Sequence, residues 1–217
     1  MRRLEFILWH CLLLLAAALP PSAALAQSGS AQSREAGHIT ALLPVDHVLR
    51  EGQALPAAKD MSLLWSDVVK TESGGRVRIA LSDGSILNIG SDAQLRILPY
   101  DARRKQTTLE LLSGRLLADV VRIAKHKGKF EVRTPIAVTG VVGTRFGVRS
   151  DPESTHVLCR QGTVRVRNAD PNVPGEVVLL AGEFTHVERG KPPTTPAPAP
   201  PEQFREGEEA TSIPTPP

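Results

Sequence analysis

The clearest hydrophobic pattern in the chain is an alternation of apolar and polar residues over positions 76–81. It places Val77, Ile79 and Leu81 on one face, as a half-buried strand requires. Asp83-Gly84 follows as a signal for a tight turn, after which the apolar run resumes. A helix here would hold Asp-Gly in its interior, where glycine costs about 1 kcal/mol relative to alanine. The segment therefore predicts two strands joined by a turn.

Similar patterns continue along the chain. Strands are predicted over residues 94–98, 107–112, 115–121, 129–133, 144–149, 163–167 and 183–187. Around ten short strands, separated by Gly, Asp or Pro turns and without a long helix, predict an all-β domain.

A weak repeat of glycines accompanies these strands. Gly114, Gly143, Gly162 and Gly182 each precede a strand, at spacings of 29, 19 and 20 residues. A spacing near 20 residues is typical of one coil of a β-solenoid, whereas hairpins in a β-sandwich would also give recurring glycines. We predict stacked short strands in a β-solenoid-like arrangement, with a β-sandwich as the alternative.

The start of the chain has the pattern of an export signal. Arg2 and Arg3 precede a mostly apolar run, and Ala24-Leu25-Ala26 matches the small-x-small cleavage pattern. The alternative is an uncleaved anchor, but the run spans about 14 residues against roughly 20 for a membrane helix. Residues 1–26 are therefore predicted to be a cleaved signal peptide. The mature protein is expected in the periplasm or outside the cell, without a membrane span.

The remaining chain divides by pattern and composition. Residues 27–66 are predicted as an N-terminal extension with short strands, 67–168 as the main β domain and 169–189 as additional strands that complete it. Residues 190–217 are rich in proline and small residues and are expected to form a disordered, polyproline-like tail.

Composition narrows the classes of function. Aromatic residues are 4%, so the core must consist mainly of Val, Leu and Ile. The net charge is +3, and loss of Arg2, Arg3 and Glu5 with the signal peptide leaves +2. A charge this small does not indicate a nucleic-acid partner. Cys11 lies in the signal peptide, so Cys159 has no partner for an internal disulfide.

Three glycines, Gly140, Gly143 and Gly147, resemble a phosphate-binding loop only superficially. Such a loop leads from a strand into a helix N-terminus, but here the strand pattern continues and no Gly-Lys-Ser/Thr follows. These glycines are expected to serve turns and close packing. The alternation from Val157 predicts a buried Cys159, whereas an exposed thiol could form an intermolecular disulfide.

The other candidate catalytic or metal-binding residues form no recognisable motif. The histidines with no metal-ligand spacing are His38, His47, His126, His156 and His186, although two strands could bring the last two together. Ser82, Ser85 and Ser113 fit no nucleophile elbow, and Asp83 is a turn former. We predict no catalytic residues, no metal site and no cofactor.

Two basic clusters lie in predicted loops. They are Arg103-Arg104-Lys105 and Lys125-His126-Lys127-Lys129. One interpretation is solvated turns, and the other is an electrostatic contact with an anionic partner such as cell-wall polymer, lipid head groups or an acidic protein.

Residues from about 67 to 168 resemble the FecR domain family. The pieces that carry the resemblance are Val69-Lys70-Thr71, Gly74 to Val77, Leu81 to Ser85, Leu109 to Gly114, Phe130 to Pro135, Val138 to Val148 and Val157 to Val166. The resemblance covers about 100 of 217 residues. It implies a periplasmic, non-catalytic β domain that binds another protein. Full-length sensors of the family carry a cytoplasmic anti-sigma segment before a membrane helix, which is not expected here.

Together these observations predict a non-catalytic envelope protein that acts as a protein-interaction or signal-relay module, with another envelope protein as its partner. The alternative is a module that binds an envelope polymer such as glycan or peptidoglycan through the basic loops. The sequence does not identify the binding residues.

Overall fold

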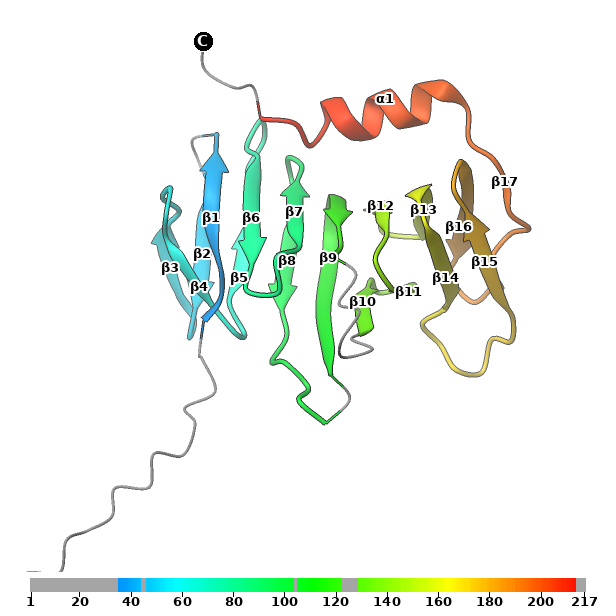
Figure 1. The fold of residues 1–217 in the computed structure, drawn as a ribbon, viewed down its shortest axis with the longest axis horizontal. Coiled ribbons are helices and arrows are strands. Elements are labelled where there is room, and N and C mark those ends of the chain that lie inside the picture. The colour runs from blue at the N-terminus through cyan, green and yellow to red at the C-terminus, as the bar shows by residue number, and fades with distance from the viewer. Residues whose placement is uncertain (1–34, 44–45, 104, 122–128, 214–217) are drawn as a thin grey trace, which may run out of the picture. The chain divides into compact units, whose positions relative to one another are not determined.

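The computed structural model describes residues 35–43, 46–103, 105–121 and 129–213, and the predicted signal peptide lies outside them. Short strands are stacked side by side in two sheets (Figure 1). Sheet A contains, in spatial order, β4 (Ser62–Leu64), β1 (Glu35–Leu42), β6 (Val77–Leu81), β7 (Ile86–Ile89), β9 (Gln106–Asp119), β12 (Arg145–Ser150), β13 (Ser154–Gln161), β16 (Glu183–Glu188) and β17 (Ala197–Pro198).

Sheet B also runs from the N-terminal strands to the C-terminal strands, and it shares one strand, β9, with sheet A. It contains β3 (Gln53–Pro56), β2 (His47–Arg50), β5 (Val68–Lys70), β8 (Gln94–Ile97), β9, β10 (Lys129–Arg133), β11 (Ala137–Val141), β14 (Thr163–Asn168) and β15 (Glu176–Leu180).

The shared strand, β9, bends at Gly114. Its first part, up to Ser113, pairs with β8 and β10 in sheet B, and its last part pairs with β7 and β12 in sheet A. The sequence predicts two strands here, at 107–112 and 115–121. They form one strand of 14 residues, because Gly114 takes a φ of +88° and turns the backbone without ending the hydrogen-bonded ladder.

The predicted fold class is confirmed: the domain is all-β and is built of stacked short strands. Every ladder between the described strands is antiparallel except that of β9 with β10. Successive coils of a parallel solenoid would pair in parallel, so the stack resembles a solenoid in its arrangement but is assembled largely from hairpins. This explains why the glycine spacing alone could not distinguish a β-solenoid from a β-sandwich.

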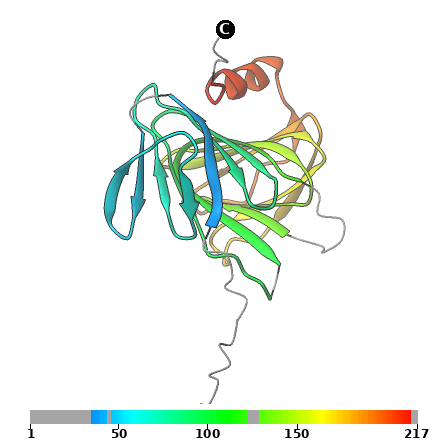
Figure 2. The same cartoon turned by 60° about the vertical axis from the view of Figure 1, so that its left-hand side comes forward.

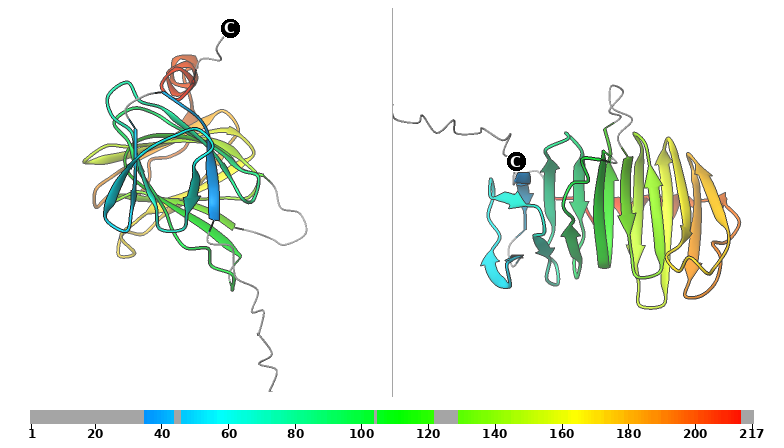
Figure 3. Two further views of the ribbon diagram at one scale, coloured as in Figure 1. Left: turned by 90° about the vertical axis from the view of Figure 1, so that its left-hand side faces the viewer. Right: turned by 90° about the horizontal axis from the view of Figure 1, so that it is seen from below.

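A single hydrophobic cluster lies between the two sheets. Alternate residues of β12, β13 and β14 point into it, as the period-two pattern predicts. Phe146 is its largest fully buried side chain. The Oγ1 atoms of Thr134 and Thr155 lie 2.7 Å apart, so a buried hydrogen bond also joins the end of β10 to β13. Figures 2 and 3 show the strands arranged around this core.

The first four strands continue the two sheets. β1 pairs with β6 and β2 pairs with β5, so residues 35–64 stack directly on the segment that follows them. A partly buried ion pair reinforces this junction, because Arg50 Nη2 lies 2.7 Å from Asp67 Oδ2. The backbone N–H of Leu64 donates to the same carboxylate oxygen at 2.8 Å. Asp67 is therefore buried with its charge compensated.

A second buried carboxylate in this region, Asp46, is less well compensated. Burial raises its pKa to about 6, the backbone N–H of Glu72 donates to Oδ1 at 3.3 Å, and Oδ2 has no hydrogen-bond partner. A folded-state pKa above the unfolded value means that the folded state holds the proton more tightly. Asp46 therefore costs stability above about pH 6, and this cost is relieved as the pH falls towards 4.

We expect Asp46→Asn to raise the free energy of unfolding by about 1 kcal/mol at pH 7.5, because it removes a desolvated charge. The gain should vanish near pH 4, where the wild-type carboxyl is protonated. Urea titrations at both pH values measure it, with the exposed Asp119→Asn as the control for loss of one charge. An equal effect of Asp46→Asn at both pH values would contradict this assignment.

The proline-rich segment differs from the expected extended, disordered tail. Residues 197–198 form β17 against β16, and α1 (Pro201–Glu209) follows; residues 214–217 lie outside the described residues. Pro201 pre-sets the backbone of the first helical turn, and Glu202 complements the helix dipole there. The segment orders because it pairs with a sheet edge and meets charges on sheet A. Within the described residues, no helix has the length and apolar character needed to cross a membrane.

Candidate functional site

The outer face of sheet A carries an apolar row across four neighbouring strands. Leu117 of β9 is the register partner of Gly147 of β12, which is also the partner of Leu158 of β13. Leu158 in turn faces Phe184 of β16. Because all four belong to the lining of one surface cavity, the pairing aligns apolar groups on the side away from the core.

Basic side chains, arginines and histidines, flank this row on both sides. On one side lie residues that are register partners on neighbouring strands: Arg115 faces Arg149, Arg149 faces His156, and His156 faces His186. On the other side lie Arg145 and Arg160. We call the apolar row and its flanking basic residues the A-face. It combines an apolar centre with a cationic rim, an arrangement suited to a partner that is apolar and acidic.

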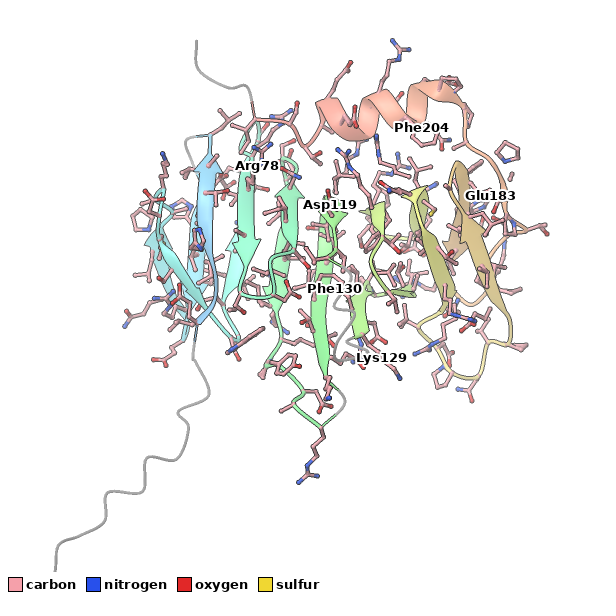
Figure 4. The ribbon with its side chains drawn as sticks, in the orientation of Figure 1. Arg78, Asp119, Lys129, Phe130, Glu183 and Phe204 are labelled. Carbon is pink, nitrogen blue, oxygen red and sulfur yellow. The ribbon has the colours of Figure 1, made fainter. Side chains whose placement is uncertain are left out.

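Helix α1 lies against the A-face, and Arg160 is its main anchor. Arg160 Nη1 donates to Glu208 Oε1 at 2.6 Å, and Nη2 donates to the carbonyl oxygen of Phe204. The Arg160 guanidinium carbon also lies 5.3 Å from the centre of the Phe204 ring, a cation–π geometry. Figure 4 shows Phe204 on the side of α1 that faces the strands.

Two further arginines contact α1. Arg145 lies 3.6 Å from Glu208, and Arg76 Nη2 donates to the carbonyl oxygen of Glu209 at 3.4 Å. The Arg160 guanidinium is almost enclosed, with 11% of its side chain exposed. Burial lowers the pKa of this group, while the neighbouring Glu208 acts in the opposite direction.

A cavity of about 110 Å³ remains between α1 and the strands. Its lining includes Gly147 and Leu158 from the strands and Gln203, Gly207 and Thr211 from α1 and the turn after it. Gly147 contributes to the space because it has no side chain and only the carbonyl oxygen of Leu116 lies near the position of a Cβ. The contact between helix and sheet is thus less tightly filled than the core.

The A-face includes a pair of histidines that the sequence could not place. The rings of His156 and His186 lie 5.8 Å apart between centroids, with 26° between their planes. His156 Nε2 is 3.7 Å from Asp151, and His186 Nε2 is 3.7 Å from Glu188. Burial, followed by the charge of Arg149, lowers the pKa of His156. No group of three metal-ligating side chains occurs in the part of the chain that the structure describes.

The remaining histidines take no part in this pair. His38 is exposed on β1 and His47 is half-buried on β2, whereas His126 lies outside the described residues.

The prediction of a buried Cys159 is confirmed. The thiol is free and fully buried, and burial raises its pKa to about 11. A thiol with this pKa is protonated at neutral pH and is a poor nucleophile. Its Sγ donates weakly to the carbonyl oxygen of Gly162 at 3.5 Å. Cys159 therefore packs as a small apolar residue.

The serines and Asp83 lie apart from the A-face lining. Asp83 Oδ1 accepts a hydrogen bond from the backbone N–H of Ser85 at 2.8 Å, which confirms its role as a turn former. Ser85 is buried and its Oγ accepts from the backbone N–H of Val121 at 3.3 Å. Ser82 and Ser113 are exposed.

The three candidate phosphate-loop glycines lie on strands and a turn, and the element that follows each of them directly is a strand. Gly143 takes a φ of +64°, as expected for a turn glycine. Close packing is wrong for Gly140 and Gly147, because an added Cβ would meet nothing within 4 Å at Gly140 and only the Leu116 carbonyl oxygen, at 3.8 Å, at Gly147. Because they have no side chain, Gly140 and Gly147 instead leave free space on the outer surfaces of sheets B and A, respectively.

The two basic clusters begin to converge where they are described. The backbone N–H of Lys129 donates to the carbonyl oxygen of Lys105 at 3.0 Å, and Arg103, Lys105 and Lys129 are exposed. Arg104 and residues 125–127 of the second cluster lie outside the described residues. This places at least three cations near one end of the β9–β10 ladder.

Comparison with known proteins supports the predicted family. Residues 67–165 match the model of the family described as FecR protein, and no curated protein matches the chain. Two crystal structures of a protein from Parabacteroides distasonis, described as a "putative anti-sigma factor", share the fold. The TM-scores are 0.54 and 0.53, both at 20% sequence identity.

These matches cover the chain in part. Each structural match covers 64% of this chain, and the chain spans about 62% of the length of the solved protein. The family match spans 67–165, whereas the sequence predicts the resemblance over 67–168. The resemblance to the FecR family that the sequence predicts is therefore confirmed for residues 67–165.

Proposed function

We propose that this protein is exported and acts in the periplasm or at the cell surface as a non-catalytic protein-interaction module that relays a signal. The match of residues 67–165 to the FecR family carries the proposal. The fold shared with a protein described as a "putative anti-sigma factor" is consistent with a regulatory role. The A-face adds a surface whose apolar centre and cationic rim suit a protein partner.

The proposal predicts a defined protein complex. A tagged chain without residues 1–26 should capture one envelope protein of the source bacterium in stoichiometric amount, and the purified pair should re-form the complex. Mass spectrometry identifies the captured protein, and analytical ultracentrifugation measures the reconstituted stoichiometry. Capture without reconstitution would count against the proposal.

Binding of an anionic envelope polymer is a second candidate function, favoured by the convergence of Lys105 and Lys129. The triple variant Arg103→Gln, Lys105→Gln, Lys129→Gln separates the two in the same experiment. Signal relay predicts that the variant keeps its protein partner and that insoluble peptidoglycan does not retain the wild type. Retention by peptidoglycan that the triple variant loses, without a protein complex, would favour the polymer-binding function.

A further inference from the structure

Helix α1 is acidic and so is opposite in charge to the arginines of the A-face. It contains four glutamates, Glu202, Glu206, Glu208 and Glu209, against one arginine, Arg205. Its exposed surface holds these charges, whereas Gln203, Phe204 and Gly207 lie half-buried towards the sheet. An acidic helix with one aromatic anchor thus covers an apolar row with a cationic rim.

The helix depends on the A-face for its stability. At nine residues it is shorter than an isolated helix needs to be stable in water. Glu208 and Glu209 lie in its last turn, where negative charge opposes the helix dipole, and no basic residue of α1 offsets them there. Arg160 and Arg145 of sheet A and Arg76, just before β6, supply the missing positive charge. We therefore expect α1 to unfold when it leaves the A-face.

The contact also leaves room for a better-fitting ligand. None of the residues of α1 is buried, and the cavity of about 110 Å³ lies beneath it at Gly147. A contact made of ion pairs, one cation–π interaction and a partly filled surface is weaker than a packed core.

The segment before α1 is fixed independently. The backbone N–H of Thr194 donates to the carbonyl oxygen of His186 at 3.0 Å, and that of Ala199 donates to Gly182 at 2.8 Å. β17 pairs with β16 between these points, and Pro193 is buried. α1 can therefore leave the A-face while residues 194–199 continue to cover the edge of sheet A.

From these observations we infer that the A-face is the docking surface of this protein, that α1 occupies it as an intramolecular placeholder, and that the partner presents an acidic helix with an aromatic anchor that displaces α1. This inference rests on the proposed function, because it names the surface and the chemistry of the partner. The placeholder would keep the A-face closed until a partner competes with it. A tethered segment competes at an effective concentration of the order of millimolar, so it blocks weak ligands and yields to tight ones.

The test uses the placeholder itself as a free probe. A fluorescein-labelled peptide of residues 199–213 is titrated against the full mature chain and against its Phe204→Ala, Glu208→Gln variant, in which the tethered helix has lost its two main contacts. Fluorescence anisotropy should show at least tenfold tighter binding to the variant than to the wild type. Equal binding to both proteins, or no binding to the variant, would overturn the inference.

Two matched arginine substitutions test whether the peptide binds a specific site or only responds to net charge. In the opened variant, Arg160→Gln should weaken peptide binding at least tenfold, because Arg160 supplies the main anchor. Arg165→Gln should leave it unchanged, since Arg165 pairs with Glu176 on sheet B at 3.0 Å. Equal losses in both would show attraction by net charge alone and would contradict a built site. Circular dichroism and thermal melts verify that each variant is folded.

The outcome separates this inference from the proposed function. An envelope partner that binds the opened variant no more tightly than the wild type would place docking elsewhere and leave the proposed function standing. Tight peptide binding to the opened variant, without capture of any envelope partner, would support α1 as a placeholder. It would contradict the signal-relay function and overturn the inference that a partner displaces α1.

Discussion

Replacing Gly114 with alanine should destabilise the fold by about 3–5 kcal/mol, a large part of the stability of an ordinary domain. Two costs combine at this position. The φ of +88° is strained for any residue with a Cβ, which costs about 1–2 kcal/mol. The added Cβ would also lie 2.4 Å from Ala93 Cβ and 2.5 Å from Ala93 Cα.

Ala93 has little freedom to move away. Its backbone N–H donates to Thr71 Oγ1 at 2.9 Å, and its carbonyl oxygen accepts from the Thr71 N–H at 2.9 Å. Relief of the clash must therefore disturb either these hydrogen bonds or the bend of β9 between the sheets. Urea unfolding followed by circular dichroism measures the effect.

Gly182→Ala is the matched control for Gly114→Ala. Gly182 has nearly the same φ, +90°, but an added Cβ would meet nothing within 4 Å. It should cost only the strain, about 1–2 kcal/mol. The difference between the two variants isolates the close approach at the bend, and equal losses would show that the approach to Ala93 is not rigid.

The bend of β9 shows which features of this fold the alternation of apolar and polar residues predicts and which it does not. The alternation of residues reveals the strands, because burial of one face imposes it. It also reveals Gly114 as a break between 107–112 and 115–121. Whether a glycine ends a strand or bends it depends on the neighbouring strands, which here continue the ladder on both sides. Such pairing is non-local and leaves no mark in the segment itself.

In the proline-rich segment, composition misses the order that contacts with the rest of the chain impose. Its composition correctly indicates that it cannot form a core, and this favours an extended tail. Its order comes from groups outside the segment: Arg160, 48 residues away, binds Glu208, and His186, eight residues away, accepts a hydrogen bond from Thr194. The spacing of Gln203, Phe204, Gly207 and Thr211 after Pro201 was the available signal for a helix with one contacting face.

The A-face could not be predicted from the sequence either, because it arises from contacts between distant segments. Leu117, Gly147, Leu158 and Phe184 each occupy the outward position of a strand, where an isolated apolar residue is unremarkable. Only the register of four strands aligns them into one row. The pairing of His156 with His186 has this origin too, since 30 residues separate them in the sequence.

Replacing Phe146 with alanine should cost about 3–5 kcal/mol, because it removes the largest fully buried side chain of the core. Phe146 lies on β12 opposite Ala118 of β9 and Cys159 of β13. Both neighbours are small, so they cannot fill the space that the ring leaves. Aromatic residues are scarce in this chain, and no other phenylalanine among the described residues is fully buried.

A graded pair of variants tests this packing. Phe146→Leu keeps most of the apolar volume and should lose about 1–2 kcal/mol, whereas Val142→Ala, at a side chain that is 55% exposed, should change stability by less than about 0.5 kcal/mol. Urea unfolding measures all three. If Phe146→Ala cost no more than Val142→Ala, the ring could not lie between the sheets. Stability that rises in the order Ala, Leu, wild type would instead show that the apolar volume at this position holds β12 against the core, and the A-face lies on the other side of that same strand.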